Sequence, residues 1–135
     1  MSLTNIRSAL ESAVDGMQPT LQTVHQGESY DPIIGTPYQA IYLLPALPEN
    51  PTMGDGFYRE AGILQVTLNY SAGEGTADAT VRAEAIRALF RRGATFAYGG
   101  TVVQVDRTAA ITEGEGDEGF IAVIVRVRWH ADIYN

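Results

Sequence analysis

The segment that most constrains the fold is residues 57–91, in which a strand pattern runs through a glycine turn into a helix pattern. In residues 61–70, one predicted face carries Leu64, Val66, Leu68 and Tyr70, and the other carries Ile63, Gln65, Thr67 and Asn69. In residues 77–91, the predicted apolar stripe consists of Val81, Ala85, Ile86, Leu89 and Phe90. The first strand face is therefore expected in the core, and the second is mixed enough to meet water or a neighbouring subunit.

Other patterns complete the predicted fold. A helix is expected at 3–15, and strands at 21–25, 37–45 and 119–130. Gly99–Gly100 between two apolar runs predicts a hairpin within 94–107. The order α-β-β-β-α-β-β-β indicates an α+β fold, with a mostly antiparallel or mixed sheet and two helices on one side. The length of 135 residues suits a single domain over 1–135.

Composition excludes several classes of site. The chain has no cysteine, and all nine basic residues are arginine, which rules out thiolate chemistry and a catalytic or phosphate-binding lysine. A net charge of −7 makes non-specific nucleic-acid binding unfavourable. No signal peptide or membrane span is recognisable, so a soluble intracellular protein is expected.

The turn at residues 71–76, Ser-Ala-Gly-Glu-Gly-Thr, superficially resembles a phosphate-binding loop. A P-loop requires a lysine, and a dinucleotide fingerprint requires a third glycine, and both are missing. Glu74 would also repel a phosphate. The turn is therefore interpreted as a joint between strand and helix, with Thr76 as the helix cap.

Other candidate sites are also incomplete. Residues 112–119, TEGEGDEG, resemble half of a calcium loop but lack its twelfth-position acid, so a flexible acidic hairpin loop is expected. His25 and His130 are expected at strand ends, and Ser71 lies in no nucleophile elbow. On the second helix, Arg82, Arg87 and Arg91 are expected on a solvated face. No enzymatic activity, metal or cofactor is predicted.

Two segments are candidates for protein contacts. Residues 45–56 form a proline-rich loop, either a contact arm or a plain solvent loop. In strand 119–130 one face is apolar, whereas the other mixes Phe120 and Ile124 with Arg126, Arg128 and His130, which is unusual for a solvent face. The predicted subunit or partner contacts are Pro45, Pro48, Pro51, Thr52, Met53, Arg126 and Arg128.

Three stretches carry a resemblance to a known family. They are residues 35–54, GTPYQAIYLLPALPENPTMG; residues 62–79, GILQVTLNYSAGEGTADA; and the closing Gly-Gly hairpin with its long final strand. In these stretches the chain resembles the phage tail terminator-like proteins, which are related to the minor tail protein U of long-tailed phages. The acidic 112–119 segment is a departure from the family pattern.

The resemblance implies a structural protein of a phage or prophage that forms a ring, typically a hexamer. Such a ring caps the tail tube, stops its polymerisation and offers a surface to head-completion or connector proteins. It implies assembly in the host cytoplasm, a place in the virion tail, and DNA only as passing cargo. A neck or head–tail completion protein is the alternative, and a small nucleotide-binding enzyme is a further one.

Overall fold

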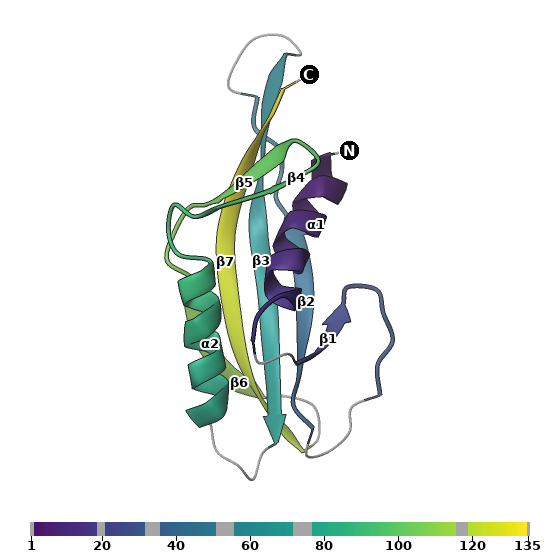
Figure 1. Ribbon diagram of the computed structural model, residues 1–135, viewed down its shortest axis with the longest axis vertical. Helices are drawn as coiled ribbons and strands as arrows, with labels where there is room; N and C mark the ends of the chain where they lie inside the picture. Colours follow the sequence, from purple (N-terminus) through teal and green to yellow (C-terminus); the bar gives the residue numbers. More distant parts are fainter. Residues whose placement is uncertain are drawn as a thin grey trace.

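The computed structural model describes residues 2–18, 21–31, 36–50, 56–71, 77–115 and 119–134 (Figure 1). Its elements are α1 (Ser2–Asp15), β1 (Gln22–His25), β2 (Tyr38–Pro45), β3 (Phe57–Ser71), α2 (Ala77–Leu89), β4 (Thr95–Tyr98), β5 (Thr101–Val105), β6 (Ala110–Glu115) and β7 (Phe120–Tyr134). The α+β class and the predicted order are confirmed, and the structure adds the strand β6.

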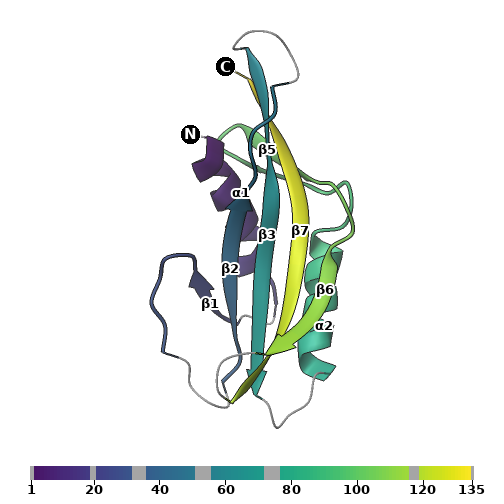
Figure 2. The same cartoon turned by 180° about the vertical axis from the view of Figure 1, so that it is seen from behind.

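The sheet is built around the long pair β3 and β7, which are antiparallel from Phe57 opposite Tyr134 to Ser71 opposite Phe120. Its main order is β1-β2-β3-β7-β5-β4, and among the described strands only β1 and β2 pair in parallel. The second edge of β7 is shared, because β6 pairs with its first half and β5 with its second half. Both helices cover the same face of this sheet (Figures 1 and 2).

The core lies between that face and the helices. The fully buried aliphatic and aromatic side chains include Ile6 and Leu10 of α1, Ile86 of α2, Leu64, Val66 and Leu68 of β3, and Val125, Val127 and Trp129 of β7. The predicted alternation of β3 and β7 is therefore confirmed. Removal of this apolar surface from water is the main force that holds the helices on the sheet.

The buried stripe of α2 differs from the prediction. The helix buries Ala79, Arg82, Ala83 and Ile86, whereas Val81 is 68% exposed. Small alanine side chains allow this side of the helix to approach the sheet, and the Arg82 guanidinium reaches Gln39 Oε1 at 3.4 Å. The prediction of a solvent-exposed Arg82 was wrong, because periodicity alone could not choose between two faces that both contain alanine.

The acidic segment is also more regular than expected. Residues 110–115 form β6, paired with β7 from Ala110 opposite Arg126 to Glu115 opposite Ile121. Thr112 to Glu115 are therefore strand rather than loop, whereas residues 116–118 lie outside the described part. In the second hairpin, Gly99 and Gly100 both have positive φ (59° and 85°), which confirms the predicted tight turn between β4 and β5.

The loop between β2 and β3 starts as a continuation of the hairpin. The Ala46 amide donates to the Ala61 carbonyl at 2.8 Å, and Glu49 and Arg59 exchange two backbone hydrogen bonds of 2.8 Å. We call residues 45–50 with residues 56–61 the β2–β3 arm; it projects beyond the rest of the sheet beside the C-terminus (Figures 1 and 2). The sequence predicted a loop from Pro45 onward, whereas backbone pairing between the two segments continues to Glu49.

Candidate interaction surface

The helices leave the opposite face of the sheet uncovered (Figure 2). We call the outward-facing side chains of β2, β3 and β7 on this side the open sheet face. Strand alternation and the register place on it Tyr42 and Leu44 of β2, Ile63, Gln65 and Thr67 of β3, and Ile124, Arg126, Arg128, His130 and Asp132 of β7. These side chains are mostly half-buried or exposed, as the sequence led us to expect of a mixed face.

Cross-strand pairs organise the polar part of the open sheet face. Arg59 donates two hydrogen bonds to the Asp132 carboxylate, from Nε at 2.7 Å and from Nη2 at 3.2 Å. The hydrogen bond from Arg59 holds the pKa of Asp132 below its ordinary value. Arg126 Nε donates to Gln65 Oε1 at 3.2 Å. Each pair joins residues directly opposite each other on β3 and β7, so the ladder register fixes both contacts.

Three arginines surround a hollow of about 220 Å³ next to this ladder. We call it the arginine hollow; its lining consists of Ile63, Arg107, Thr108, Ala110, Arg126 and Arg128. Arg107 and Arg128 are exposed, and no carboxylate in the described part of the chain pairs with either. A concentration of unneutralised cations is notable in a chain of net charge −7, and it favours an anionic contact.

The end of the open sheet face near β1 is aromatic. Tyr38 lies between Tyr30 and Phe120, with ring centroids 4.9 and 5.4 Å away. A second hollow of about 350 Å³ adjoins this cluster, lined by Val24, Glu28, Tyr30, Tyr38, Ala40, Tyr42, Thr67, Asn69, Ala122 and Ile124. Aromatic rings beside an open hollow are typical of surfaces that bind other proteins.

The predicted contact residues separate into two groups. Pro45 and Pro48 are exposed on the β2–β3 arm, whereas Arg126 and Arg128 lie on the open sheet face. Pro51, Thr52 and Met53 lie outside the described residues. Arg128 is opposite Ile63, which is in turn opposite Leu44, so the base of the arm and the arginine hollow are at neighbouring levels of the sheet.

Sequence patterns missed Arg107 as a member of this surface. It belongs to the connection between β5 and β6, and it reaches Arg126 and Arg128 only because both strands pair with β7. Arg59 and Asp132 were missed for a similar reason, since they are 73 residues apart and meet through the β3–β7 register. The alternation of β7 correctly predicted which of its side chains lie on the open sheet face. It could not predict which residues of other segments lie beside them.

The described residues assemble no catalytic constellation. His130 Nδ1 contacts the Asp106 carboxylate, but no hydroxyl nucleophile hydrogen-bonds to either histidine in the part that the structure describes. Ser71 is buried, and its Oγ makes no hydrogen bond to described residues. In the same ranges no group of three or more metal-ligating side chains occurs. The glycine turn at 72–76 lies outside the described part.

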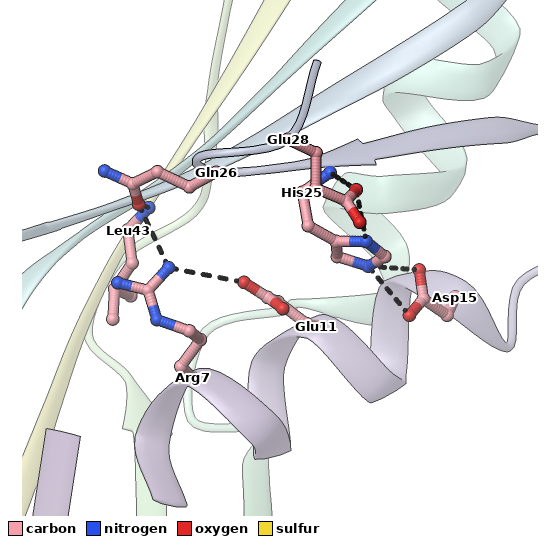
Figure 3. Close-up of polar contacts among 7 residues, drawn as sticks. All are labelled: Arg7, Glu11, Asp15, His25, Gln26, Glu28 and Leu43. Atoms are coloured by element: carbon pink, nitrogen blue, oxygen red, sulfur yellow. Dashed lines mark hydrogen bonds and ion pairs between the residues drawn. The ribbon is translucent and has the colours of Figure 1, made fainter. Parts of the chain in front are cut away.

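His25 lies instead in a polar cluster that joins α1 to β1 (Figure 3). Its Nε2 is 3.1 Å from Asp15 Oδ2, and its Nδ1 is 3.2 Å from Glu28 Oε1. Partial burial lowers the pKa of His25, but the hydrogen bonds to Asp15 and Glu28 and the negative charges of Asp15 and Glu11 outweigh burial and raise the pKa above 6.5. The hydrogen bonds from the His25 amide and ring lower the pKa of Glu28 below 4.5. The cluster is therefore a structural clasp.

This clasp predicts a pH-dependent contribution to stability. The raised pKa of His25 means that its contribution is complete below pH 6.5 and is lost as the pH rises through the folded-state value. The lowered pKa of Glu28 means that its contribution to stability is complete above pH 4.5 and is lost as the pH falls through the folded-state pKa. We expect His25→Gln to lower the free energy of unfolding by about 0.5 kcal/mol at pH 5.5, the scale of a partly exposed ion pair, and by less at pH 8.5.

Urea denaturation of the wild type and His25→Gln at both pH values measures this difference. Asp15→Asn is the matched control, because it removes the partner of His25 and should show the same pH dependence. An equal loss at pH 5.5 and pH 8.5 would contradict the ion-pair account of the clasp.

None of the helices in the described ranges is both long and apolar enough to cross a membrane. A family model described as "Phage tail terminator protein" matches residues 5–129 of the chain. A solved structure matches with a TM-score of 0.77 and 25% sequence identity, and the alignment covers 100% of this chain and 99% of that chain. No match was found among curated proteins.

Proposed function

Because the chain belongs to the phage tail terminator protein family, a family of structural components of phage tails, we propose that it caps the tail tube as a ring. In this role it ends polymerisation of the tube protein and provides the surface on which the head-completion or connector protein docks. The observation that carries the proposal is the family match over nearly the whole chain. Assembly in the host cytoplasm and incorporation into the virion tail are parts of the same proposal.

The surfaces described above support self-assembly into a ring. A closed ring needs a head-to-tail contact between two different patches of the same chain. The open sheet face, with its arginine hollow, is one candidate patch, and the projecting β2–β3 arm is another. The hexamer that the family resemblance implies is the ring size that we propose.

The net charge supports a passive relation to DNA. At −7 per chain, a ring would repel phosphates from most of its surface, so DNA could pass through the lumen without sticking. Mapping the charges on an assembled ring tests this part of the proposal. A predominantly basic lumen would contradict it.

Deletion of the coding sequence in the parent phage is the decisive test of the terminator role. Without the cap, tube subunits continue to add, so we expect tails of variable length that exceed the wild-type length in electron micrographs. Complementation from a plasmid is the control and should restore uniform tails. Tails of normal, uniform length in the deletion strain would contradict the proposal.

The same micrographs distinguish a neck protein, and a ligand-binding measurement distinguishes an enzyme. If the chain is instead a neck or head–tail completion protein, the deletion strain should produce tails of normal length that fail to join heads. If the chain is instead a nucleotide-binding enzyme, ATP, GTP or NAD should raise its melting temperature. A ligand at about 100 times its dissociation constant adds roughly 2.7 kcal/mol of stability.

A further inference from the structure

We propose that the hollow beside the tyrosine cluster binds the proline-rich segment 45–49 of a second copy of this chain. This inference rests on the proposed function, because it specifies how neighbouring copies meet. We call this hollow, lined by Tyr30, Tyr38 and Tyr42 among others, the tyrosine hollow. The segment belongs to the β2–β3 arm, and its sequence is Pro-Ala-Leu-Pro-Glu. Hollow and segment are thus two different patches of one chain.

The segment presents an apolar anchor to solvent. All of residues 45–49 are exposed. Leu47 is 89% exposed, more than any other large hydrophobic side chain in the described part of the chain. An exposed leucine between two prolines contributes nothing to the core, so it is available to a partner.

The backbone of the arm explains this exposure. Hydrogen bonds tie Ala46 and Glu49 to the opposite segment 59–61. Between these positions two residues, Leu47 and Pro48, stand opposite a single residue of that segment. This arrangement is a β-bulge at a proline, and a bulge turns side chains out of the regular ladder. The paired backbone therefore holds Leu47 and Pro48 outward.

The tyrosine hollow is suited to a proline-rich segment. Its volume of about 350 Å³ falls in the range of ligand pockets, about 300–1,000 Å³. Aromatic-lined grooves bind Pro-x-x-Pro segments, because proline-rich chains are already extended and lose little entropy on binding. Pro45 and Pro48 have this spacing, and three tyrosine rings line the hollow.

A buried polar side chain in the hollow also indicates a ligand. Asn69 is 5% exposed and lines the tyrosine hollow, yet its side-chain amide makes no hydrogen bond to another described residue. This amide has two N–H donors and one carbonyl acceptor, and buried polar groups normally find partners. The backbone carbonyl and amide groups of an inserted segment would supply them.

The segment of the same chain cannot fill the tyrosine hollow. Ala40 lines the hollow, and Leu47 is seven positions further along the chain, which is roughly 23 Å of extended strand. Pairing with β3 holds the arm at one end of the sheet, whereas β1, which also lines the hollow, lies toward the other end (Figure 1). The segment that fills the hollow must come from another molecule.

Charge complementarity fixes the direction of the bound segment. The two hollows adjoin, because Ile124 lines the tyrosine hollow and Arg126, two residues further along β7, lines the arginine hollow. Leu47 and Glu49 are also two residues apart, roughly 7 Å in an extended chain. A segment with Leu47 in the tyrosine hollow, running in the direction of β7, therefore brings Glu49 to the arginine hollow. There Arg128 is exposed and has no carboxylate partner among the described residues.

A contact of this kind favours a ring over a symmetric dimer. The arm and the tyrosine hollow are different patches of the same protein, so each copy can use both at once with two different neighbours. Such heterologous contacts close into rings when the rotation between copies permits it.

Photo-cross-linking from the arm tests the contact. The photoreactive residue p-benzoylphenylalanine takes the place of Leu47 in the full-length chain, and it keeps the anchor large and apolar. This variant is mixed with isotope-labelled wild type and irradiated, and the adducts are mapped by peptide mass spectrometry. We expect adducts to the labelled copy within residues 38–42, 67–69 or 122–124. Adducts only within one chain, adducts elsewhere, or none at the highest soluble concentration overturn the inference.

Matched variants establish the role of the anchor. Leu47→Asp should raise the dissociation constant for self-association, measured by analytical ultracentrifugation, at least about tenfold, as loss of an interface anchor does. Tyr42→Ser, at an exposed position of the hollow, should have a similar effect. Val81→Asp is the control, because Val81 is 68% exposed on α2, away from both patches. Equal effects of Leu47→Asp and Val81→Asp would reject the anchor. Circular dichroism with a thermal melt verifies that each variant folds.

Charge exchange tests the direction of the segment. Glu49→Arg should weaken self-association at least about tenfold, since close charge pairs across interfaces are coupled on that scale. Adding Arg128→Glu to the same chain should restore it, and a loss that persists in the double variant contradicts this pairing. Over-long tails after deletion, combined with adducts outside the hollow, would leave the terminator role standing and reject only this interface. Uniform tails of normal length, combined with the expected adducts, would support the contact and reject the terminator role.

Discussion

Trp129→Ala is expected to lower the free energy of unfolding by about 3–5 kcal/mol. Trp129 of β7 is among the largest fully buried side chains and belongs to the core cluster. Its removal leaves a cavity between the sheet and the helices, which neighbouring groups on a paired strand cannot collapse to fill. A domain of this size is typically stable by about 5–15 kcal/mol, so the variant loses a large share of its stability.

Urea or guanidinium denaturation followed by circular dichroism measures this loss, because the variant lacks the tryptophan fluorophore. Trp129→Phe is the control: it keeps most of the ring volume and removes an indole N–H that makes no hydrogen bond to described residues. We expect the phenylalanine variant to lose less than half as much stability. Similar midpoints for Trp129→Ala and the wild type would contradict the contribution of the buried Trp129 side chain to the core.

Gly62→Ala should have the second large effect, a loss of roughly 3 kcal/mol, at the upper end of the range for overpacked sites. A Cβ on Gly62 would lie 2.5 Å from the Leu44 carbonyl oxygen, 2.8 Å from Trp129 Cζ2 and 2.9 Å from the Pro45 Cα. Two of these atoms belong to the backbone of β2, which is paired with β3 and cannot yield without loss of the ladder. Only glycine therefore fits where β2, β3 and the tryptophan ring meet.

The two sites should be coupled, because they are directly opposite each other on β3 and β7. In a double-mutant cycle, Trp129→Phe should relieve the part of the Gly62→Ala penalty that comes from the ring. The part that comes from Leu44 and Pro45 should remain, so the rescue is incomplete. Gly56→Ala is a matched control, since a Cβ there meets nothing within 4 Å. Strict additivity of the Gly62 and Trp129 substitutions would show that the ring is not in contact with this position.

Local patterns were sufficient where one face of an element is clearly more apolar than the other. The alternation of Leu64, Val66 and Leu68 predicted the buried face of β3, and the glycine pair at 99–100 predicted the hairpin turn. For α2 the pattern was insufficient. Its alanines make several faces nearly equivalent, and the face that packs on the sheet includes Arg82, which hydrogen-bonds to Gln39.

The candidate surface was only partly predictable. Arg126 and Arg128 were recognisable from the mixed outer face of the last strand, and the resemblance to tail terminators is confirmed by the family match. Arg107 was not recognisable, since no local pattern connects it to residues about twenty positions later. The roles of the predicted contact residues stay predictions.

The sequence by itself determined the α+β class, the apolar faces of the main strands and the family, because short-range periodicity and motif spacing are local properties of the chain. Only the tertiary structure decided which charges stand side by side. The β3–β7 register brings Arg59 to Asp132, and the shared edge of β7 brings Arg107 to Arg126 and Arg128. Such juxtapositions arise from strand pairing between distant segments, so they depend on how the whole sheet closes.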